Sequence, residues 1–213
     1  MPERSPTFRV RARGPMACFT RPELKVERVS YEVMTPSAAR GVLEAILWKP
    51  AIRWHIERIR VLNAIKFGQL RRNEVNGRLS ERGEHATYCA DEDRAQRNTL
   101  YLADVDYIIE THFEMTEKAG PADNTTKFAE MFQRRLEKGQ HFHQPYLGCR
   151  EFEAIVTPAP DLLPAADQSL KGIRPLGLIL HDIEFGPANK ARFFEARLMD
   201  GVMDVPRFEA EAP

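Results

Sequence analysis

The sequence predicts an α+β fold, in which a ferredoxin-like βαββαβ domain is followed by a small C-terminal antiparallel β-sheet. Three observations predict it. Strand-like segments with period-two alternation lie on either side of two segments with the apolar spacing of amphipathic helices. Both helix starts carry capping residues. The elements then follow the strand–helix–strand–strand–helix–strand order of the ferredoxin-like arrangement, which leaves one sheet face free.

The first half of this unit contains a strand, a helix and a second strand. Residues 8–13 alternate between apolar side chains and arginines, as in a half-buried strand. Thr35 is a good N-cap, and Pro36 suits the first position of the helix that follows. Pro50 makes a continuation of that helix unfavourable. Residues 51–63 are rich in Ile, Val and Trp, which predicts a strand or a bent hairpin.

The second half begins with a polar, arginine-rich insertion over about 68–99, interpreted as a hairpin or a functional insertion. Residues 101–115 alternate like a strand. Asp123 or Asn124 can cap a second helix, and Gly139 marks its end.

The last strand of the unit is predicted at 146–157, and a Pro- and Ala-rich linker is predicted at 157–175. Further strands are expected at 176–185, 192–199 and 202–205. The chain therefore divides into a ferredoxin-like domain, 1–157, and a small β-rich region, 158–213, that packs on it.

The composition excludes several classes of protein. Hydrophobic residues make up 43% of the 213 residues, which is enough for a packed core. Three scattered cysteines argue against a disulfide framework and for a reducing cytosol. No apolar run reaches the roughly 20 residues of a membrane helix, and no signal peptide is apparent. We therefore expect a soluble cytoplasmic protein without a membrane partner.

The charge is unevenly distributed although the formal net charge is zero. Residues 1–72 hold 15 Lys and Arg against 6 Asp and Glu, whereas the remainder holds 16 against 25. Such asymmetry is typical of proteins that bind polyanions. Alternatively, the two halves interleave in the fold and the asymmetry averages out.

Two groups of arginines are candidates for RNA binding. Arg9, Arg11 and Arg13 lie on one strand face, about 6.6–7 Å apart, which is close to phosphate spacing. The insertion contributes Arg71, Arg72 and Arg97, which could clamp phosphates or stack on bases. The alternative for both groups is a solvated surface, and the acidic residues of the insertion favour it there.

Other motifs carry weaker indications. Trp48 and Lys49 end the first helix, where the indole could stack on a base or pack against the core. His141 and His143, with Cys149 nearby, are metal-ligating types but specify no geometry, so no metal site is predicted. The sequence lacks a P-loop, a Rossmann glycine pattern and a nucleophile elbow.

Several phrases together resemble one family over nearly the whole chain, the CRISPR-associated repeat-processing proteins of type I-C systems. The phrases, in order, are ACFTRP (17–22), KVERVSY (25–31), TPSAARG (35–41), WKP (48–50), RRNEV (71–75), QRNT (96–99), AG (119–120) and LGCREF (147–152).

This resemblance implies metal-independent, cofactor-free cleavage of precursor CRISPR repeat RNA on the 3′ side of its hairpin. It further implies that the protein stays on the 5′ handle, with the other subunits of the type I-C interference complex as partners. It extends the candidate RNA-binding residues to Arg21. The alternative function is a non-catalytic subunit that binds repeat RNA and duplex DNA.

The chain departs from the family pattern at two positions. The family has an aromatic or imidazole residue before the Trp-Lys-Pro block and a Lys-His pair at the start of the second helix. Here Leu47 and Phe128 stand there, and neither can transfer a proton. Lys127 keeps the lysine and is the leading catalytic candidate. Three interpretations remain: His141, His143 or Tyr146 supplies the acid and base; cleavage is slow; or cleavage is lost.

Overall fold

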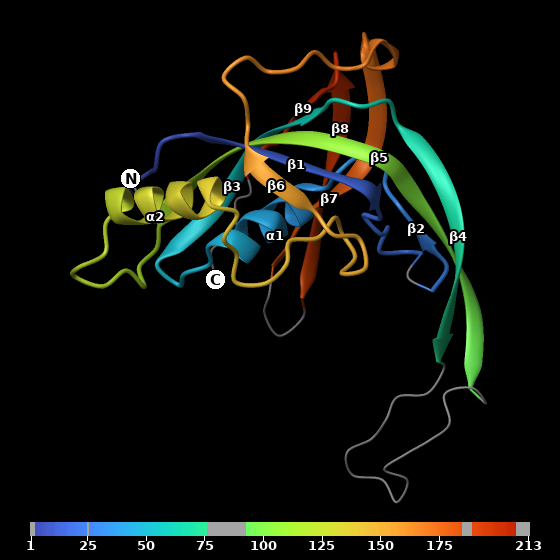
Figure 1. Ribbon diagram of the computed structural model, residues 1–213, viewed down its shortest axis with the longest axis horizontal. Helices are drawn as coiled ribbons and strands as arrows, with labels where there is room; N and C mark the ends of the chain where they lie inside the picture. The colour runs from blue at the N-terminus through green and yellow to red at the C-terminus, as the bar shows by residue number, and fades with distance from the viewer. Residues whose placement is uncertain (1–2, 25, 76–92, 185–188, 208–213) are drawn as a thin grey trace, which may run out of the picture.

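The structure is a computed structural model, and it describes residues 3–24, 26–75, 93–184 and 189–207 (Figure 1). Two α-helices, one 3-10 helix and a set of strands make up this part of the chain. In order, they are β1 (Phe8–Ala17), β2 (Arg28–Val29), α1 (Pro36–Ile46), β3 (Ile52–Val61), β4 (Lys66–Val75), β5 (Arg94–Met115), α2 (Thr125–Glu137), β6 (Ile155–Pro158), η1 (Gln168–Leu170), β7 (Ile173–Glu184), β8 (Lys190–Met199) and β9 (Val202–Asp204).

The strands form one large, mainly antiparallel sheet in the order β6-β1-β5-β3-β9-β8-β7. The strands β2 and β4 pair with β5 outside this path, and only the β2–β5 ladder is parallel. The C-terminal strands join the sheet through β9, which pairs with β3. The fold is therefore α+β, with few helices, as the sequence predicts at that level.

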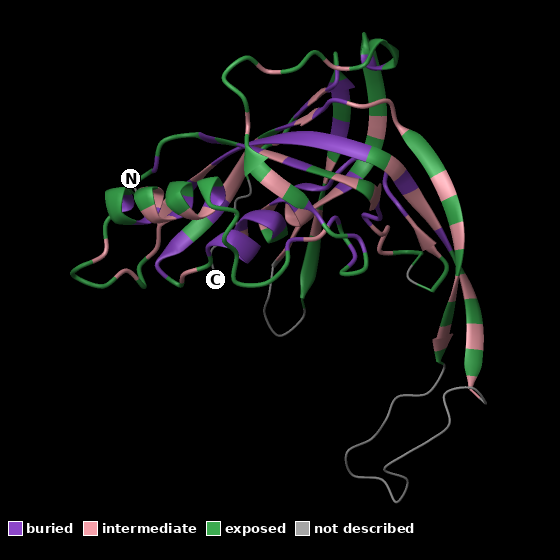
Figure 2. Ribbon diagram, viewed as in Figure 1, coloured by how far each residue is buried: buried purple, intermediate pink, exposed green. Residues whose placement is uncertain are grey.

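Both helices pack on one face of this sheet, and the core lies between them and the strands (Figure 2). Phe8, Trp54, Phe113 and Phe132 form an aromatic cluster, with ring centroids 4.6 Å apart for Trp54 and Phe132 and 5.0 Å apart for Phe8 and Phe132. The buried indole of Trp54 donates to the carbonyl of Leu47 at 3.0 Å, so its polar atom is satisfied.

The predicted helix ends are confirmed. The Thr35 hydroxyl accepts from the backbone N–H of Ala38, and Pro36 is the first helical residue. The Asn124 side chain accepts from the backbone N–H of Lys127, which decides between the two expected caps. Gly139 follows α2 with φ +62°, a conformation that favours glycine at a helix end.

The expected strand at 146–157 is wrong over most of its length, because only Ile155–Pro158 forms one. The preceding residues turn, with a single bridge between Tyr146 and Glu153. Gly148 explains the turn: its φ is +85°, and a Cβ there would lie 2.1 Å from the carbonyl oxygen of Cys18. This close approach lets Leu147 and Cys149 enter the core on either side of the glycine.

The polar insertion is a hairpin where it is described. The strand β5 begins at Arg94, well before the expected residue 101, and pairs with β4 from Lys66 to Val75. The two strands form an arm that projects from the body (Figure 1). Residues 76–92 of the insertion lie outside the described chain. The expected linker at 157–175 contains η1, and its last three residues belong to β7.

Candidate nucleic-acid interface

The predicted arginine row lies on the sheet face opposite the helices, but part of its charge is compensated. Arg11 binds the Asp106 carboxylate through two hydrogen bonds, with Nε 2.9 Å from Oδ1 and Nη2 2.5 Å from Oδ2. Arg9 lies 3.8 Å from Glu110 and is half exposed. Arg13 is exposed. The row therefore consists of one structural arginine and two that can reach a ligand.

Two further arginines join this face and were not predicted. Arg58 and Arg60 on β3 reach Glu110 at 3.6 and 2.8 Å. Residues 51–63 were predicted as a strand from their Ile, Val and Trp content, and that content says nothing of the arginines between these residues. Arg9, Arg11, Arg13, Arg58 and Arg60, hereafter the arginine face, surround two buried carboxylates, Asp106 and Glu110. Asp204 also pairs with Arg58 at 2.7 Å, so these five arginines meet three carboxylates, and the excess of positive charge that remains suits a polyanion.

The arm carries the second predicted arginine group. Arg72 bonds Thr99 at 2.7 Å and Glu74 at 2.8 Å, so it stabilises the arm itself. Arg71 is exposed and lies 3.4 Å from the Gln96 amide oxygen. Arg97 pairs opposite Arg72 across the two strands and is half buried. Of these three arginines, Arg71 is exposed, whereas Arg72 and Arg97 are half buried.

Two predicted contacts lie on the first half of the chain. Arg21 lies 4.6 Å above the Tyr31 ring and 3.8 Å from Glu23, so its guanidinium is engaged in packing. Trp48, in contrast, is 61% exposed, which excludes the alternative that it packs in the core. Lys49 follows it directly.

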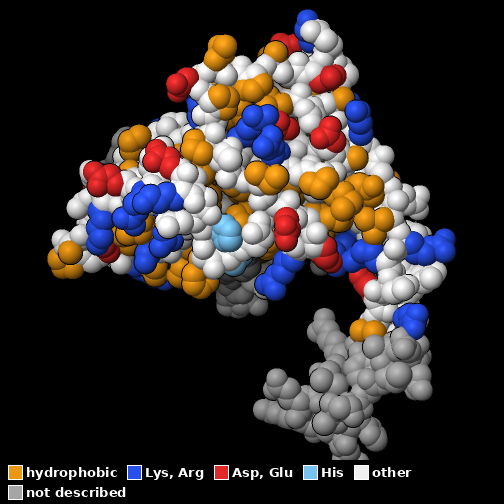
Figure 3. Space-filling model, in the orientation of Figure 1, with side chains coloured by type: hydrophobic (Ala, Val, Ile, Leu, Met, Phe, Trp, Pro, Cys, Tyr) orange, Lys and Arg blue, Asp and Glu red, His pale blue; other side chains and the backbone are white. Residues whose placement is uncertain are grey.

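The ends of the two helices meet near Trp48. The Phe142 backbone N–H donates to the carbonyl of Ala45 at 2.7 Å, and the Arg135 guanidinium donates to that of Ile46 at 2.8 Å. These bonds place the start of the 141–146 loop and the last turn of α2 beside the end of α1. Figure 3 shows Lys and Arg side chains gathered over α2.

Lys127 lies at the other end of α2, in its first turn. Its ammonium is 2.9 Å from the Asp123 carboxylate and remains 44% exposed. Lys127 and the Gly120 N–H lower the pKa of Asp123, and Lys49 adds to this effect from the end of α1. Trp48, Lys49, Asp123, Lys127, His141, Phe142 and His143 are named the helix-end surface.

The two positions at which the sequence departs from the expected family pattern are buried. Leu47 is 0% exposed and Phe128 is 3% exposed, and both belong to the core. Neither side chain reaches the surface, so they cannot contact RNA. His141 and His143 are exposed, and Tyr146 is half buried with its ring centroid 6.4 Å from that of His143. The Phe142–Ala45 hydrogen bond thus brings the His141–His143 segment beside the end of α1, close to the position where this chain has Leu47 in place of an aromatic or imidazole residue.

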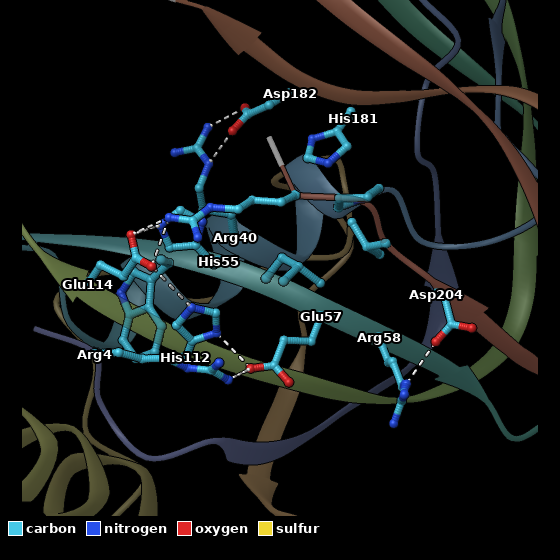
Figure 4. Close-up of a pocket in the computed structure, with 15 residues that line it drawn as sticks. Arg4, Arg40, His55, Glu57, Arg58, His112, Glu114, His181, Asp182 and Asp204 are labelled. Atoms are coloured by element: carbon cyan, nitrogen blue, oxygen red, sulfur yellow. Dashed lines mark hydrogen bonds and ion pairs between the residues drawn. The ribbon is translucent and has the colours of Figure 1, made fainter. Parts of the chain in front are cut away.

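A separate cavity of about 720 Å³, which no motif in the sequence indicated, opens beside β3 (Figure 4). His55 and His112 stack inside it, with ring centroids 5.1 Å apart. His112 Nδ1 lies 2.6 Å from Glu57, and His55 Nε2 lies 3.4 Å from Glu114. Burial lowers the pKa of His55 from 6.5 to about 4, against the opposing effect of Glu114.

The charges of this cavity compensate one another. Its four ion pairs are Arg4–Glu57, Arg40–Asp182, Arg58–Asp204 and Arg207–Glu114. Two of these pairs join Arg4, near the start of the described chain, to β3 and Arg207, the last described residue, to β5. Because four arginines face four carboxylates, the cavity does not attract a polyanion, and its clear role is to fasten the C-terminal segment to the sheet.

A buried pair of thiols lies beneath the base of the arm. The Cys149 thiol donates to the backbone carbonyl of Cys18 at 3.5 Å, and Arg28 lies 3.3 Å from Cys149 Sγ. The neighbouring Cys18 thiol and the charge of Arg28 lower the pKa of Cys149, against the opposing effect of burial. Arg28 also reaches Glu74 and Glu151, so this cluster joins the arm to the 146–154 segment.

Two further findings concern the described residues. No three of their His, Cys, Asp or Glu side chains are arranged to hold a metal ion. None of their helices combines the length and the apolar character needed to cross a membrane.

Comparison with known proteins identifies the family. The model of the family described as "CRISPR-associated protein (Cas_Cas5)" matches residues 7–208. The chain belongs to the Cas5d family. The resemblance inferred from the sequence phrases is thereby confirmed.

Two relatives in the Cas5d family carry the name "CRISPR pre-crRNA endoribonuclease Cas5d". The protein of Mannheimia succiniciproducens is 50% identical over 211 residues, which cover 93% of this chain and 94% of the relative. The protein of Thermus thermophilus is 40% identical over 218 residues, covering 93% and 91%.

Solved structures share the fold. One titled "Crystal Structure of CRISPR-associated Protein" has a TM-score of 0.72 at 25% identity, covering 99% of this chain and 95% of that one. A chain of a "CRISPR RNA-guided surveillance complex" has a TM-score of 0.51 at 17% identity, covering 95% and 90%.

Proposed function

We propose that this protein binds CRISPR repeat RNA and cleaves precursor CRISPR RNA without a metal or cofactor. The activity named for its Cas5d relatives supports the endoribonuclease assignment. The helix-end surface supports a location for this activity: Lys49 follows the exposed Trp48 after the end of α1, Lys127 lies in the first turn of α2, and two exposed imidazoles follow the end of α2.

In the proposed reaction, the 2′-hydroxyl of the RNA attacks the adjacent phosphorus and the 5′-oxygen leaves. Lys127 stabilises the negative charge that develops on the phosphate oxygens. His141, His143 and Tyr146 are the candidates for removing the 2′-hydroxyl proton and for protonating the leaving oxygen. The pairing with Asp123 at 2.9 Å keeps the Lys127 ammonium in place while leaving it open to solvent.

RNA binding uses the arginine face, the arm and the end of α1. The proposed contacts are Arg9, Arg11, Arg13, Arg21, Trp48, Lys49, Arg71, Arg72 and Arg97. Because Arg11 and Arg72 are held by internal ion pairs, their contribution is positional. The exposed members supply the phosphate contacts.

One observation favours a second function. Leu47 and Phe128 are buried and cannot transfer protons. A protein that has lost cleavage would still bind the repeat as a non-catalytic subunit and contact duplex DNA with the same cationic surfaces.

The proposal extends to architecture and partners. We place β6, β1, β5 and β3 with α1 and α2 in a ferredoxin-like unit, 1–157, and the remaining strands in a C-terminal region, 158–213. The fold shared with a surveillance-complex chain supports a role on the 5′ handle beside other subunits of the type I-C interference complex. The free thiols of Cys18 and Cys149 fit the cytoplasm.

Replacement of Lys127 by alanine tests the catalytic assignment. We expect Lys127→Ala to slow single-turnover cleavage of repeat RNA about 100-fold at saturating protein, because a charge-stabilising group is lost. The matched control is Lys171→Ala, which removes an exposed lysine that follows η1 and belongs to no proposed site. Cleavage by Lys127→Ala at the unaltered rate would remove Lys127 from the reaction.

A further inference from the structure

Two large aromatic side chains of the helix-end surface are exposed. Phe142 is 88% exposed and Trp48 is 61% exposed. Aromatic rings of this size normally contribute to folding by being buried, so these two contribute little to the stability of the free protein. A single exposed aromatic residue is ordinary, whereas two exposed aromatic residues near the ends of α1 and α2 indicate a surface that binds a ligand.

The backbone holds Phe142 in this position. Its N–H donates to the carbonyl of Ala45, three residues before Trp48, and the N–H of Gln140 donates to Arg135 at 2.8 Å. The Phe142 ring stands at 90° to that of His143, with centroids 6.1 Å apart. The loop is therefore attached to α2 two residues before the exposed ring and to α1 at Phe142 itself, which limits the entropy lost when a ligand stacks on the ring.

The charges nearby indicate the chemistry of that ligand. Lys49 follows Trp48, Arg135 bonds the end of α1, and His141 and His143 flank Phe142. A lipid tail or an apolar peptide would supply no anionic group to Lys49 or Arg135. A single-stranded nucleic acid supplies both a flat base for each ring and phosphates for the cations.

We infer that Phe142 and Trp48 form a stacking site for unpaired nucleobases that flank the stem of the repeat hairpin. The inference rests on the proposed function, because it assumes that repeat RNA reaches this surface. Paired bases inside a stem hide their faces, so the site selects single-stranded nucleotides next to the stem. Stacking there places the flanking strand beside the imidazoles proposed as acid and base.

Two RNAs and three variants test the site. The RNAs are the repeat hairpin with its single-stranded flanks and the same hairpin trimmed flush to its stem. The variants are Phe142→Leu, Phe142→Trp and Phe193→Leu. Phe193 is a control that is 45% exposed on β8 and belongs to no proposed site. Because Phe142 is exposed, its replacement leaves folding intact.

We expect Phe142→Leu to bind the flanked hairpin about 10-fold more weakly, a size typical of one lost base stack. Phe142→Trp and Phe193→Leu bind as the unaltered protein does. The slope of log affinity against log salt stays the same in Phe142→Leu, because no phosphate contact is lost. On the flush hairpin, Phe142→Leu and the unaltered protein bind equally.

Two results would overturn the inference alone: unchanged binding of the flanked hairpin by Phe142→Leu, or an equal loss on both RNAs. If the unaltered protein bound neither RNA, the proposed function would fail and this inference with it. The two failures are thus distinguishable in one set of measurements.

Discussion

The stacked histidine pair predicts a pH-dependent stability. His55 is 13% exposed and lies against His112, beneath the Arg207–Glu114 ion pair. Burial lowers its pKa to about 4; Glu114 opposes this shift, whereas His112, Arg207 and Arg53 add to it. In the unfolded chain the imidazole takes up its proton at about 6.5. As the pH falls below that value, the unfolded chain therefore binds more protons, and the folded state loses stability.

The size of the loss follows from the two pKa values. Between pH 7 and pH 5, His55 alone lowers the free energy of unfolding by about 2 kcal/mol, and the limit well below pH 4 is about 3 kcal/mol. Urea unfolding at pH 7 and pH 5 measures it, with His55→Gln as the variant that cannot take up the proton. We expect the unaltered protein to lose about 2 kcal/mol more than His55→Gln over this range.

Equal losses in the two proteins would refute this reasoning, since they would mean that the His55 imidazole is protonated equally well in both states. His143→Gln controls for the removal of an imidazole at an exposed position.

Two further pairs of variants test the packing and the arginine face. Gly148→Ala should lower the free energy of unfolding by more than about 2 kcal/mol, because φ is +85° and the Cβ meets the Cys18 carbonyl. For Gly139→Ala, where φ is +62° and the space is open, we expect a loss of about 1 kcal/mol in the free energy of unfolding. Urea unfolding measures both variants, and equal losses would contradict the close approach of the Cys18 carbonyl to Gly148. Arg11→Ala should cost about 2 kcal/mol by leaving buried Asp106 unpaired, after allowance for the partial exposure of Arg11. Arg13→Ala should keep stability but reduce the salt dependence of RNA affinity by about one phosphate contact; an unchanged salt slope would exclude Arg13 from the interface.

Local signals in the sequence predicted the elements that depend on near neighbours. Thr35 and Asn124 are caps because each side chain bonds a backbone N–H three residues on. The alternation over residues 8–13 placed the apolar side chains in the core and the arginines on the opposite face. Such features need no knowledge of the rest of the chain.

Features that depend on distant residues could not be predicted in this way. Arg11 and Asp106 meet only because β1 and β5 pair. No sequence pattern near either residue predicts the ion pair between them. The stacked histidines depend on the β3–β5 register, in which His55 lies opposite His112. Gly148 turns the chain where the backbone of Cys18, just after β1, approaches it. At the helix-end surface, Trp48 was a candidate RNA contact from the sequence alone. Phe142 became a candidate only when the structure showed that it is exposed beside the end of α1.

The central claim, metal-independent cleavage of repeat RNA, is tested most directly with 5′-labelled repeat RNA in EDTA. A second substrate carries deoxyribose at the cut position. The account predicts a single cut that persists in EDTA and disappears with the deoxyribose substrate, because the 2′-hydroxyl is the attacking group. Tight binding without a cut would contradict it. The buried Leu47 and Phe128 would then mark a lost active site, in a protein that only binds the repeat.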